Sequence, residues 1–369
     1  MPFTVLSDAN IQTLLNNLTP TDVTSLTQSL NSALIQYSCA NETQYQPARA
    51  HVTRPTGQTS LFMPATTPTS IGVKIVGVAP SSTPARGQKP EPALRSVLTV
   101  CDARGAAVGV LNAAELTAFR TALGSMLLYR FRKTSDNILV FGAGKQAEWH
   151  IRLAVLLKGD AIRKITIVNR SAARATALLE SLSQSGVVGS TAIKMDVFDV
   201  EKKGEADLAA LVTEADVVFC TTPSTTPLFS AAVLATEAAR KKARYVAAIG
   251  SYRLDMAEMD PEMLKQITDP EGPFSNQVYD ASIAVDSIKG CMDEAGELVS
   301  AGIKEERMVE VGKMVGLREG HGGEAVRKWL EEGFVVYKSV GVGVMDIAIG
   351  RALMDLAGEK GVGVRLDSF

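Results

Sequence analysis

The ten residues from Ile138 to Ala147 constrain the fold of this chain more than any other stretch. Their order, Ile-Leu-Val-Phe-Gly-Ala-Gly-Lys-Gln-Ala, predicts a buried strand, a tight turn and the first turn of a helix. Gly142 allows the sharp turn, Gly144 lets the backbone approach a pyrophosphate, and Ala147 lets the helix pack closely on the strand. The helix N-terminus offers free N–H groups to phosphates. The pattern therefore predicts a nicotinamide dinucleotide site in a redox enzyme, with a ligand-free glycine turn as the alternative.

Three later apolar stretches predict further strands of a nucleotide-binding sheet. They are Lys164–Val168, Ala215–Cys220 and Tyr245–Ile249, and helical segments alternate with them. Strands that alternate with helices favour a parallel sheet with helices on its faces. We therefore expect the α/β fold class, with a Rossmann-type doubly wound parallel sheet over residues 134–330.

The end of the first of these three strands indicates which dinucleotide is bound. NAD sites usually place Asp or Glu there to hold the ribose 2′-hydroxyl. This chain has Asn169, Arg170 and Ser171, with Arg174 one helical turn later. Arg170 and Ser171 can hold a 2′-phosphate instead, because the guanidinium presents a planar fork of donors. The residues favour NADP(H); the alternative is a solvated arginine and less selective binding of NAD(H).

The sequence outside this sheet predicts a second domain. Residues 7–37 and 112–132 have the spacing of helices. The tail after residue 330 shows no place in the nucleotide sheet, so residues 331–369 are expected to join residues 1–133. The Pro-rich residues 79–93 predict either a lid or a loose insertion. Short apolar stretches, separated by Pro, Gly and Ser, predict a small antiparallel sheet or barrel at 60–63, 72–78, 95–100 and 107–111.

Length, charge and composition limit the function classes. A chain of 369 residues suits two domains, and its net charge of −2 gives no electrostatic footprint for nucleic acid or an anionic membrane. No apolar run reaches the length of a membrane span, and the first residues lack a secretory signal. Four widely spaced cysteines predict buried free thiols, and none of the three histidines has metal-ligand spacing. We expect a cytoplasmic protein without bound metal, nucleic acid or membrane.

Several stretches together resemble one family, the ornithine cyclodeaminase/mu-crystallin family. They occur in family order along nearly the whole chain. The resemblance implies a homodimer whose N-terminal part and C-terminal return form an α+β substrate-binding and dimerisation domain beside the Rossmann domain. It also implies NAD(P)(H)-dependent chemistry on amino acids or cyclic ketimines. The matching stretches are Gln46–Arg49, Met63–Pro64, Gly72–Lys74, Leu116–Ala122, Phe141–Ala147, Thr221–Thr222, Glu294–Leu298 and Lys338–Gly341.

Basic residues in apolar or small-residue surroundings predict a carboxylate site. Arg49, Lys74 and Arg120 would repel one another in one pocket, and a substrate α-carboxylate would supply the missing counter-ion. The two arginines can clamp it bidentately, whereas Lys74 suits proton transfer at a substrate nitrogen because lysine pKa values shift readily. The resemblance implies that these three residues and Met63 line the substrate site. The alternative is a surface lysine at a strand end and a salt bridge on a helix.

Two further turns are expected at the nicotinamide end of the cofactor. Thr221, Thr222 and Pro223 follow a strand, where hydroxyls bind the ribose or cap the next turn. Ser339 is expected near the nicotinamide amide, unless its segment is an ordinary strand-end turn. The full set of expected cofactor-binding residues is Thr121, Gly142, Ala143, Gly144, Lys145, Gln146, Ala147, Asn169, Arg170, Ser171, Arg174, Thr221, Thr222, Pro223, Ser339, Val340 and Gly341.

One departure from the family pattern decides which reaction is expected. Cyclodeaminases carry an Asp two residues after the glycine that matches Gly250, and this chain has Tyr252 there. A phenol is a poor base at neutral pH, and Asp255 is more simply a helix-start carboxylate. His150 and Glu297 are interpreted as structural residues.

We therefore expect an NADPH-dependent reductase of a C=N bond beside a carboxylate, such as a pyrroline- or piperideine-2-carboxylate. Lys74 would deliver the proton, and Tyr252 would shape the pocket or donate a hydrogen bond. The alternatives are an ornithine cyclodeaminase, an NAD-dependent alanine dehydrogenase, and a non-catalytic NADPH-binding protein like mu-crystallin.

Overall fold

A computed structural model describes residues 2–79, 94–186, 192–274, 282–319 and 323–369. The chain forms two compact units, one of residues 1–120 and 342–369 and the other of residues 121–341. Of the Pro-rich stretch for which a lid was considered, residues 80–93 lie outside the described residues. No helix in the described ranges is both long enough and apolar enough to cross a bilayer.

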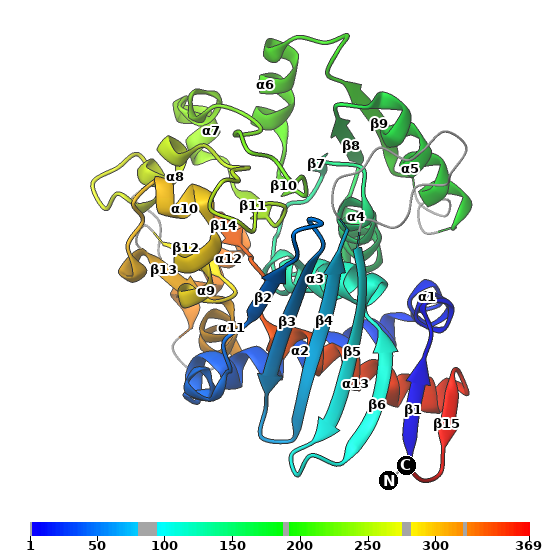
Figure 1. Cartoon of the computed structure of the whole chain (residues 1–369). Helices are drawn as coiled ribbons and strands as arrows, with labels where there is room; N and C mark the ends of the chain where they lie inside the picture. The colour runs from blue at the N-terminus through cyan, green and yellow to red at the C-terminus, as the bar shows by residue number, and fades with distance from the viewer. Residues whose placement is uncertain (1, 80–93, 187–191, 275–281, 320–322) are drawn as a thin grey trace. The chain divides into compact units, whose positions relative to one another are not determined.

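The first unit is built on a seven-stranded sheet (Figure 1). Strands β2 to β6 form an antiparallel meander, and β1 adds to it in parallel beside β6. The expected antiparallel sheet is therefore present. Its strand order is β15-β1-β6-β5-β4-β3-β2, with bounds Phe3–Leu6 (β1), Ala50–Thr53 (β2), Thr59–Thr66 (β3), Ser70–Val78 (β4), Leu94–Asp102 (β5), Ala107–Asn112 (β6) and Val364–Leu366 (β15).

Of the described α-helices, those that belong wholly to this unit are α1 (Asp8–Asn16), α2 (Pro20–Cys39) and α13 (Gly343–Lys360). The first two lie in the range 7–37 that was expected to be helical, and their starts have local causes: Ser7 and Thr19 close capping boxes, and Pro20 stands at the first helical position. Helix α13 packs against α2 and strands β3, β4 and β5. A short 3-10 helix, η1 (Glu42–Tyr45), follows α2.

Strand β4 shows how this sheet sorts its side chains. Lys74 and Val76 are buried on one face, while Ile71 and Ile75, on the other, stay 39% and 36% exposed. Phe62 of β3 lies opposite Ile75 in register and is 39% exposed. We call Phe62, Ile71, Val73 and Ile75 the outer apolar face of the sheet.

The second unit is a parallel sheet with helices, which confirms the Rossmann-type doubly wound prediction (Figure 1). Its eight described strands run in the order β13-β12-β14-β11-β10-β7-β8-β9, and their pairings are parallel. The bounds are Asn137–Phe141 (β7), Lys164–Asn169 (β8), Lys194–Asp199 (β9), Val217–Cys220 (β10), Arg244–Ala248 (β11), Ile283–Val285 (β12), Met308–Glu310 (β13) and Phe334–Lys338 (β14).

The helices of this unit follow the strands that they connect. Apolar side chains of the central strands, such as Leu139, Val218 and Val246, form one core with the helices. The α-helices are Lys145–Lys158 (α4), Ala172–Gln184 (α5), Glu205–Glu214 (α6), Glu237–Lys241 (α7), Pro261–Thr268 (α8), Ile288–Glu294 (α9), Gly296–Ser300 (α10), Val311–Glu319 (α11) and Glu324–Glu332 (α12), with 3-10 turns at Gly159–Ala161 (η2), Ala231–Leu234 (η3) and Glu305–Arg307 (η4).

The tail contradicts one expectation about domain organisation. Strand β14 lies inside the parallel sheet, paired with β11 and β12, so Phe334–Lys338 has a place there and does not return to the first unit. Its five residues are all buried, as in a central parallel strand. The prediction failed because a short apolar run looks the same in the sequence whether it belongs to a parallel or to an antiparallel sheet. The return to the first unit begins at Val342.

The other crossing between units lies within helix α3 (Ala114–Tyr129), where the expected boundary was residue 133. Buried Arg132 explains why residues 121–133 join the second unit. Its guanidinium donates to the carbonyl oxygens of Leu330 (2.7 Å) and Gly333 (2.8 Å), at the end of α12. Burial lowers the pKa of Arg132 to about 10, which still leaves it protonated at neutral pH.

The cysteines match expectation only in part. Cys220 and Cys291 are buried, but Cys39 is exposed and Cys101 is half-buried. Cys39 is the last residue of α2, where the helix leaves the core. The four thiols are free.

Candidate functional site

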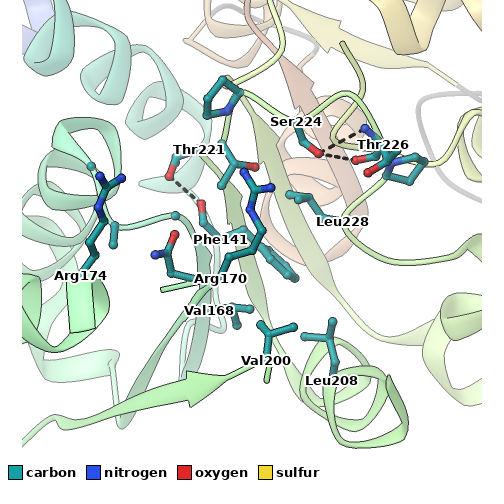
Figure 2. Close-up of a pocket in the computed structure, with 17 residues that line it drawn as sticks. Phe141, Val168, Arg170, Arg174, Val200, Leu208, Thr221, Ser224, Thr226 and Leu228 are labelled. Atoms are coloured by element: carbon teal, nitrogen blue, oxygen red, sulfur yellow. Dashed lines mark hydrogen bonds between the residues drawn. The ribbon is translucent and has the colours of Figure 1, made fainter. Parts of the chain in front are cut away.

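A cavity of about 440 Å³ opens in the second unit at the carboxyl ends of β7, β8 and β10 (Figure 2). This is the point where the strand order reverses, because β8 follows β7 on one side of the sheet and β10 lies on its other side. Ligands of open α/β sheets bind at such switch points. Its lining residues are Phe141, Gly142, Ala143, Gly144, Val168, Asn169, Arg170, Arg174, Val200, Leu208, Thr221, Thr222, Pro223, Ser224, Thr226, Pro227 and Leu228.

The first glycine of the fingerprint is required by the protein itself. Gly142 has φ of +116°, a region that L side chains rarely adopt. A Cβ at this position would also lie 2.6 Å from Thr221 Oγ1. The Thr221 hydroxyl in turn donates to the carbonyl oxygen of Phe141, at 2.6 Å, which fastens the end of β10 to the end of β7. The turn after β7 is therefore fixed by its neighbours.

The second glycine is not required by any described neighbour. Gly144 is the N-cap of α4, with φ of −105°, which any residue can adopt. Within the described chain, a Cβ on Gly144 would meet nothing within 4 Å. The space beside it belongs to the cavity, at the positive end of a fourteen-residue helix. Such a cradle fits an anionic group that approaches the backbone closely.

Arg170 and Arg174 line the same cavity and are exposed, so their guanidinium groups are available to an anion (Figure 2). Asn169 and Ser171 play a local part. The Asn169 side-chain amide donates to the Ser171 carbonyl oxygen at 2.9 Å, and Ser171 caps α5. Among the described residues that line the cavity, none is Asp or Glu. The donor set thus suits a phosphate better than a ribose hydroxyl at this end.

The remaining expected cofactor residues lie outside the cavity lining. Ala147 is fully buried and packs α4 on the sheet, whereas Lys145 is largely exposed and pairs with Glu148 at 3.3 Å. Thr121 is buried in α3, and Gln146 is half-buried in α4. Conversely, the apolar wall residues Val200, Leu208 and Leu228 were not predicted, because an isolated Val or Leu after a strand carries no signal of a binding role.

The Ser339–Gly341 turn is organised by a residue that sequence reasoning missed, Asp286. One oxygen of its buried carboxylate accepts from the Ser339 hydroxyl and the Gly341 N–H, both at 2.6 Å. The other accepts from the N–H groups of Ser287 and Val340, at 2.9 and 3.3 Å. The Ser339 hydroxyl therefore donates its hydrogen bond to another residue of the protein in this structure.

The first unit contains a buried charge cluster around Lys74. Lys74, Arg120 and Asp346 are 1%, 4% and 1% exposed. The Asp346 carboxylate lies 2.8 Å from Lys74 Nζ through Oδ2, and its Oδ1 accepts from Arg120 Nε at 2.9 Å. Asp346 comes from α13 and was not predicted, since nothing local in the sequence marks it. It supplies part of the counter-charge that the sequence analysis assigned to substrate alone.

Two predicted substrate residues lie close to this cluster. Met63 of β3 is directly opposite Lys74 in the antiparallel register, on the same face of the sheet. Arg49 is exposed, and its positive charge acts on Lys74. Thr117 joins the cluster unpredicted: its hydroxyl accepts from Lys74 Nζ at 3.4 Å and donates to the Ala113 carbonyl oxygen at 2.6 Å. The structure thus brings Arg49, Met63, Lys74 and Arg120 together.

The surroundings of Lys74 lower its pKa to about 8. Burial is the main cause, because it penalises the charged ammonium. Asp346 opposes this and raises the pKa, while the positive charges of Arg120 and Arg49 lower it. Lys74 is therefore protonated at neutral pH but close enough to its titration point to give up a proton.

Three other residues named from the sequence, Tyr252, Asp255 and His150, have different surroundings. Tyr252 is 48% exposed in the second unit, with the Arg253 guanidinium 5.9 Å from its ring centroid. Asp255 forms two hydrogen bonds with Arg253, at 2.9 and 3.0 Å, which lower its pKa. His150 is packed: its ring nitrogens lie 2.9 Å from Ser125 Oγ and 2.7 Å from the Gln146 carbonyl oxygen, and burial lowers its pKa to about 4.

A parallel sheet with a glycine-rich first turn and a cavity at its switch point defines a dinucleotide-binding protein of the Rossmann class. Within that class, the chain belongs to the ornithine cyclodeaminase/mu-crystallin family, whose sequence pattern matches residues 11–361.

Comparisons with individual proteins agree with this membership. The chain is 26% identical over 319 residues to a Δ1-pyrroline-2-carboxylate reductase of Bacillus cereus, which covers 84% of this chain and 85% of the relative. It shares the fold of the Thermococcus litoralis Δ1-pyrroline-2-carboxylate reductase in complex with NADH and L-proline, with a TM-score of 0.73, 18% identity and coverage of 98% and 99%. An archaeal alanine dehydrogenase dimer with bound NAD has a TM-score of 0.73 at 18% identity, with full coverage of both chains.

The charge cluster makes a testable prediction about stability. Asp346→Asn leaves two buried cations facing one neutral amide, so we expect a loss of about 3–5 kcal/mol in the free energy of unfolding. Lys74→Met leaves Arg120 and Asp346 as a one-to-one pair, so its cost should be smaller, about 1 kcal/mol. Urea unfolding of both variants measures the difference, and an equal loss in the two would contradict the pairing.

Proposed function

We propose that this protein is an NADPH-dependent reductase of a C=N bond adjacent to a carboxylate, with a cyclic ketimine such as pyrroline- or piperideine-2-carboxylate as substrate. The observation that carries the proposal is buried Lys74, an ammonium with a pKa of about 8 that pairs with Asp346, a carboxylate it shares with Arg120. The family membership and the reductase relative support the same reaction class.

The cluster suits an anionic substrate because its charges do not balance. Lys74 and Arg120 are buried cations that share one anion, the Asp346 carboxylate, and the positive charge of exposed Arg49 also acts on Lys74. One substrate carboxylate reduces the excess, with the guanidinium groups of the arginines as its partners. Of the three N–H groups of Lys74, the described residues give partners to two, Asp346 and Thr117. The third is the donor that we assign to the substrate nitrogen.

The reaction needs one proton and one hydride. Lys74 gives the proton to the imine nitrogen and is left neutral, which its lowered pKa favours. A bound nicotinamide cofactor supplies the hydride to the imine carbon, so that C=N becomes CH–NH. We assign its phosphates to Gly142–Gly144 and the α4 N-terminus, and a 2′-phosphate to Arg170 and Arg174.

We predict that imine reduction depends on the protonated form of Lys74. Lys74 is protonated below its pKa of about 8, so kcat/KM should fall tenfold per pH unit above about pH 8. Lys74→Met should lower kcat at least about 100-fold and leave NADPH binding unchanged. NADPH oxidation at 340 nm with a five- and a six-membered cyclic imine carboxylate measures both.

A Lys74→Met protein that still reduced these imines at the wild-type rate would refute the proton-donor role. A folded wild type that binds NADPH but reduces neither imine would refute the reductase proposal itself. Ornithine with NAD and alanine with NAD would then separate a cyclodeaminase from an amino-acid dehydrogenase.

We predict that Arg170 and Arg174 select NADPH over NADH. Each substitution to Ala removes charge-assisted hydrogen bonds to the 2′-phosphate, so NADPH should bind about 10–100-fold more weakly while NADH changes little. Arg163→Ala is the matched control, because Arg163 is highly exposed at the opposite end of β8 and pairs with Asp136. Equal losses for the two cofactors in fluorescence titrations would show that neither arginine reads the 2′-phosphate.

We also propose that the protein is a homodimer through the outer apolar face of the first-unit sheet. Contiguous exposed apolar side chains on a sheet mark an interaction surface, and one fold relative is described as a dimer. Ile75→Asp should therefore give a monomer in sedimentation velocity, whereas Leu317→Asp, an exposed apolar position of the second unit, should leave the dimer intact. A monomeric wild type at micromolar concentration would contradict this proposal.

A further inference from the structure

One buried carboxylate of the second unit has no part in the chemistry proposed above. Glu258 is fully buried between the carboxyl ends of β10 and β11. Its Oε1 accepts from the Thr222 N–H at 2.6 Å and from the Thr222 hydroxyl at 3.2 Å. Its Oε2 accepts from the N–H groups of Gly250 and Ser251, at 2.6 and 3.3 Å. The carboxylate therefore joins the loop after β10 to the loop after β11.

The backbone around Glu258 is bound to the same cavity wall. Its carbonyl oxygen accepts from the Leu228 N–H at 2.9 Å, and the Ala257 N–H donates to the Ser224 carbonyl oxygen at 2.9 Å. Thr222, Ser224 and Leu228 all line the cavity. Residues 257–258 thus form hydrogen bonds with three positions of this cavity wall, Thr222, Ser224 and Leu228.

The two loops that Glu258 joins are in direct backbone contact. A Cβ on Gly250 would lie 2.1 Å from the Thr222 carbonyl oxygen and 2.4 Å from its nitrogen. A side chain at position 250 would therefore push Thr222 out of place. The close approach and the shared carboxylate both fix the position of Thr222 relative to β11.

A second layer of charge lies behind Glu258. Lys338 of β14 and Glu297 of α10 are fully buried and form an ion pair at 3.0 Å. Lys338 also donates to the Ser251 carbonyl oxygen and hydroxyl, at 2.5 and 2.6 Å, and the Ser251 hydroxyl contacts Glu297. With Glu258 ionised, two carboxylates share one ammonium. Cys220 of β10 also faces this group, and burial raises the pKa of its thiol, so it stays uncharged.

The hydrogen-bond donors around Glu258 favour its ionised form, whereas its burial disfavours that form. Three of the four groups that contact its oxygens are backbone N–H donors, so an added proton on the carboxyl would find an acceptor only at the Thr222 hydroxyl, which would then no longer donate to it. Burial raises the pKa to about 7, against the charge of Lys338 and the hydrogen bonds of Thr222 and Gly250. Protonation below about pH 7 would therefore weaken the hold on Thr222.

We propose that Glu258 is a positioning residue for the dinucleotide pocket, which holds the Thr221–Leu228 wall in its binding conformation while its carboxylate is ionised. The inference rests on the proposed function in one respect, that the cavity binds a nicotinamide dinucleotide. If Glu258 has this role, the affinity for the whole dinucleotide depends on pH, although Glu258 itself does not line the cavity.

The test is equilibrium binding of NADPH to the full chain between pH 6 and 8.5, by fluorescence titration. Adenosine 2′,5′-bisphosphate, which lacks the nicotinamide half, is titrated in parallel as a probe of the Arg170 end. For the wild type, we expect NADPH binding to weaken as the pH falls through about 7, more than bisphosphate binding does. Glu258→Gln should bind NADPH about tenfold more weakly at pH 8, lack this extra pH step, and bind the bisphosphate normally.

Matched variants separate positioning from folding. Glu262→Gln, an exposed carboxylate on α8, should behave like the wild type in both titrations. If Glu258→Gln does not fold, Glu258→Asp replaces it: its shorter side chain should weaken NADPH binding while it keeps the pH step.

Two results would overturn the inference, and they differ in what else they refute. A folded Glu258 variant with wild-type NADPH affinity and the wild-type pH step would refute the positioning role alone. A wild type that binds the bisphosphate but not NADPH, or neither, would refute the dinucleotide pocket and the positioning role together.

Discussion

The first unit depends on one electrostatic constraint: two cations cannot be buried together without an anion between them. Lys74 comes from the middle of a strand and Arg120 from a helix, and both side chains are buried by the packing around them. The neutralising carboxylate, Asp346, lies 272 residues after Lys74 in the sequence. The return of the C-terminal helix to the first unit is therefore an electrostatic requirement as well as a matter of apolar packing.

This arrangement lets Lys74 stay protonated at neutral pH and still give up a proton readily, two properties that would otherwise conflict. Burial alone would drive its pKa down until the ammonium lost its proton, and a full set of carboxylate partners would hold the proton too tightly for transfer. One carboxylate and two guanidinium groups leave the pKa near 8, in the range where a general acid works at neutral pH. The same excess of buried positive charge is the reason that a carboxylate-bearing substrate is proposed for this site.

In the second unit, hydrogen bonds hold the loop residues of the cavity wall in place. The turn after β7 is fixed by Gly142 and the Thr221 hydroxyl. The next wall segment is fixed by hydrogen bonds to residues 257–258, with a buried lysine and a second carboxylate behind them. Asp286 does the same for the turn after β14. Among the described residues, buried carboxylates that accept from backbone N–H groups thus fix loops at two places, Asp286 and Glu258, while Glu297 accepts from the Ser251 hydroxyl.

The sequence by itself determined the local features whose cause is local. The glycine turn, the strand before it and the helix after it follow from residue type and spacing, and so do the capped starts of α1 and α2. The cationic residues could be named because they stand in apolar or small-residue stretches that resemble the family's motifs. Only the tertiary structure decided what lies far apart in the chain: that β14 inserts between β11 and β12, that Asp346 neutralises Lys74, and that Glu258 supports Thr222. An acidic residue on a helix or a short apolar run has many possible partners, and only the folded chain selects one of them.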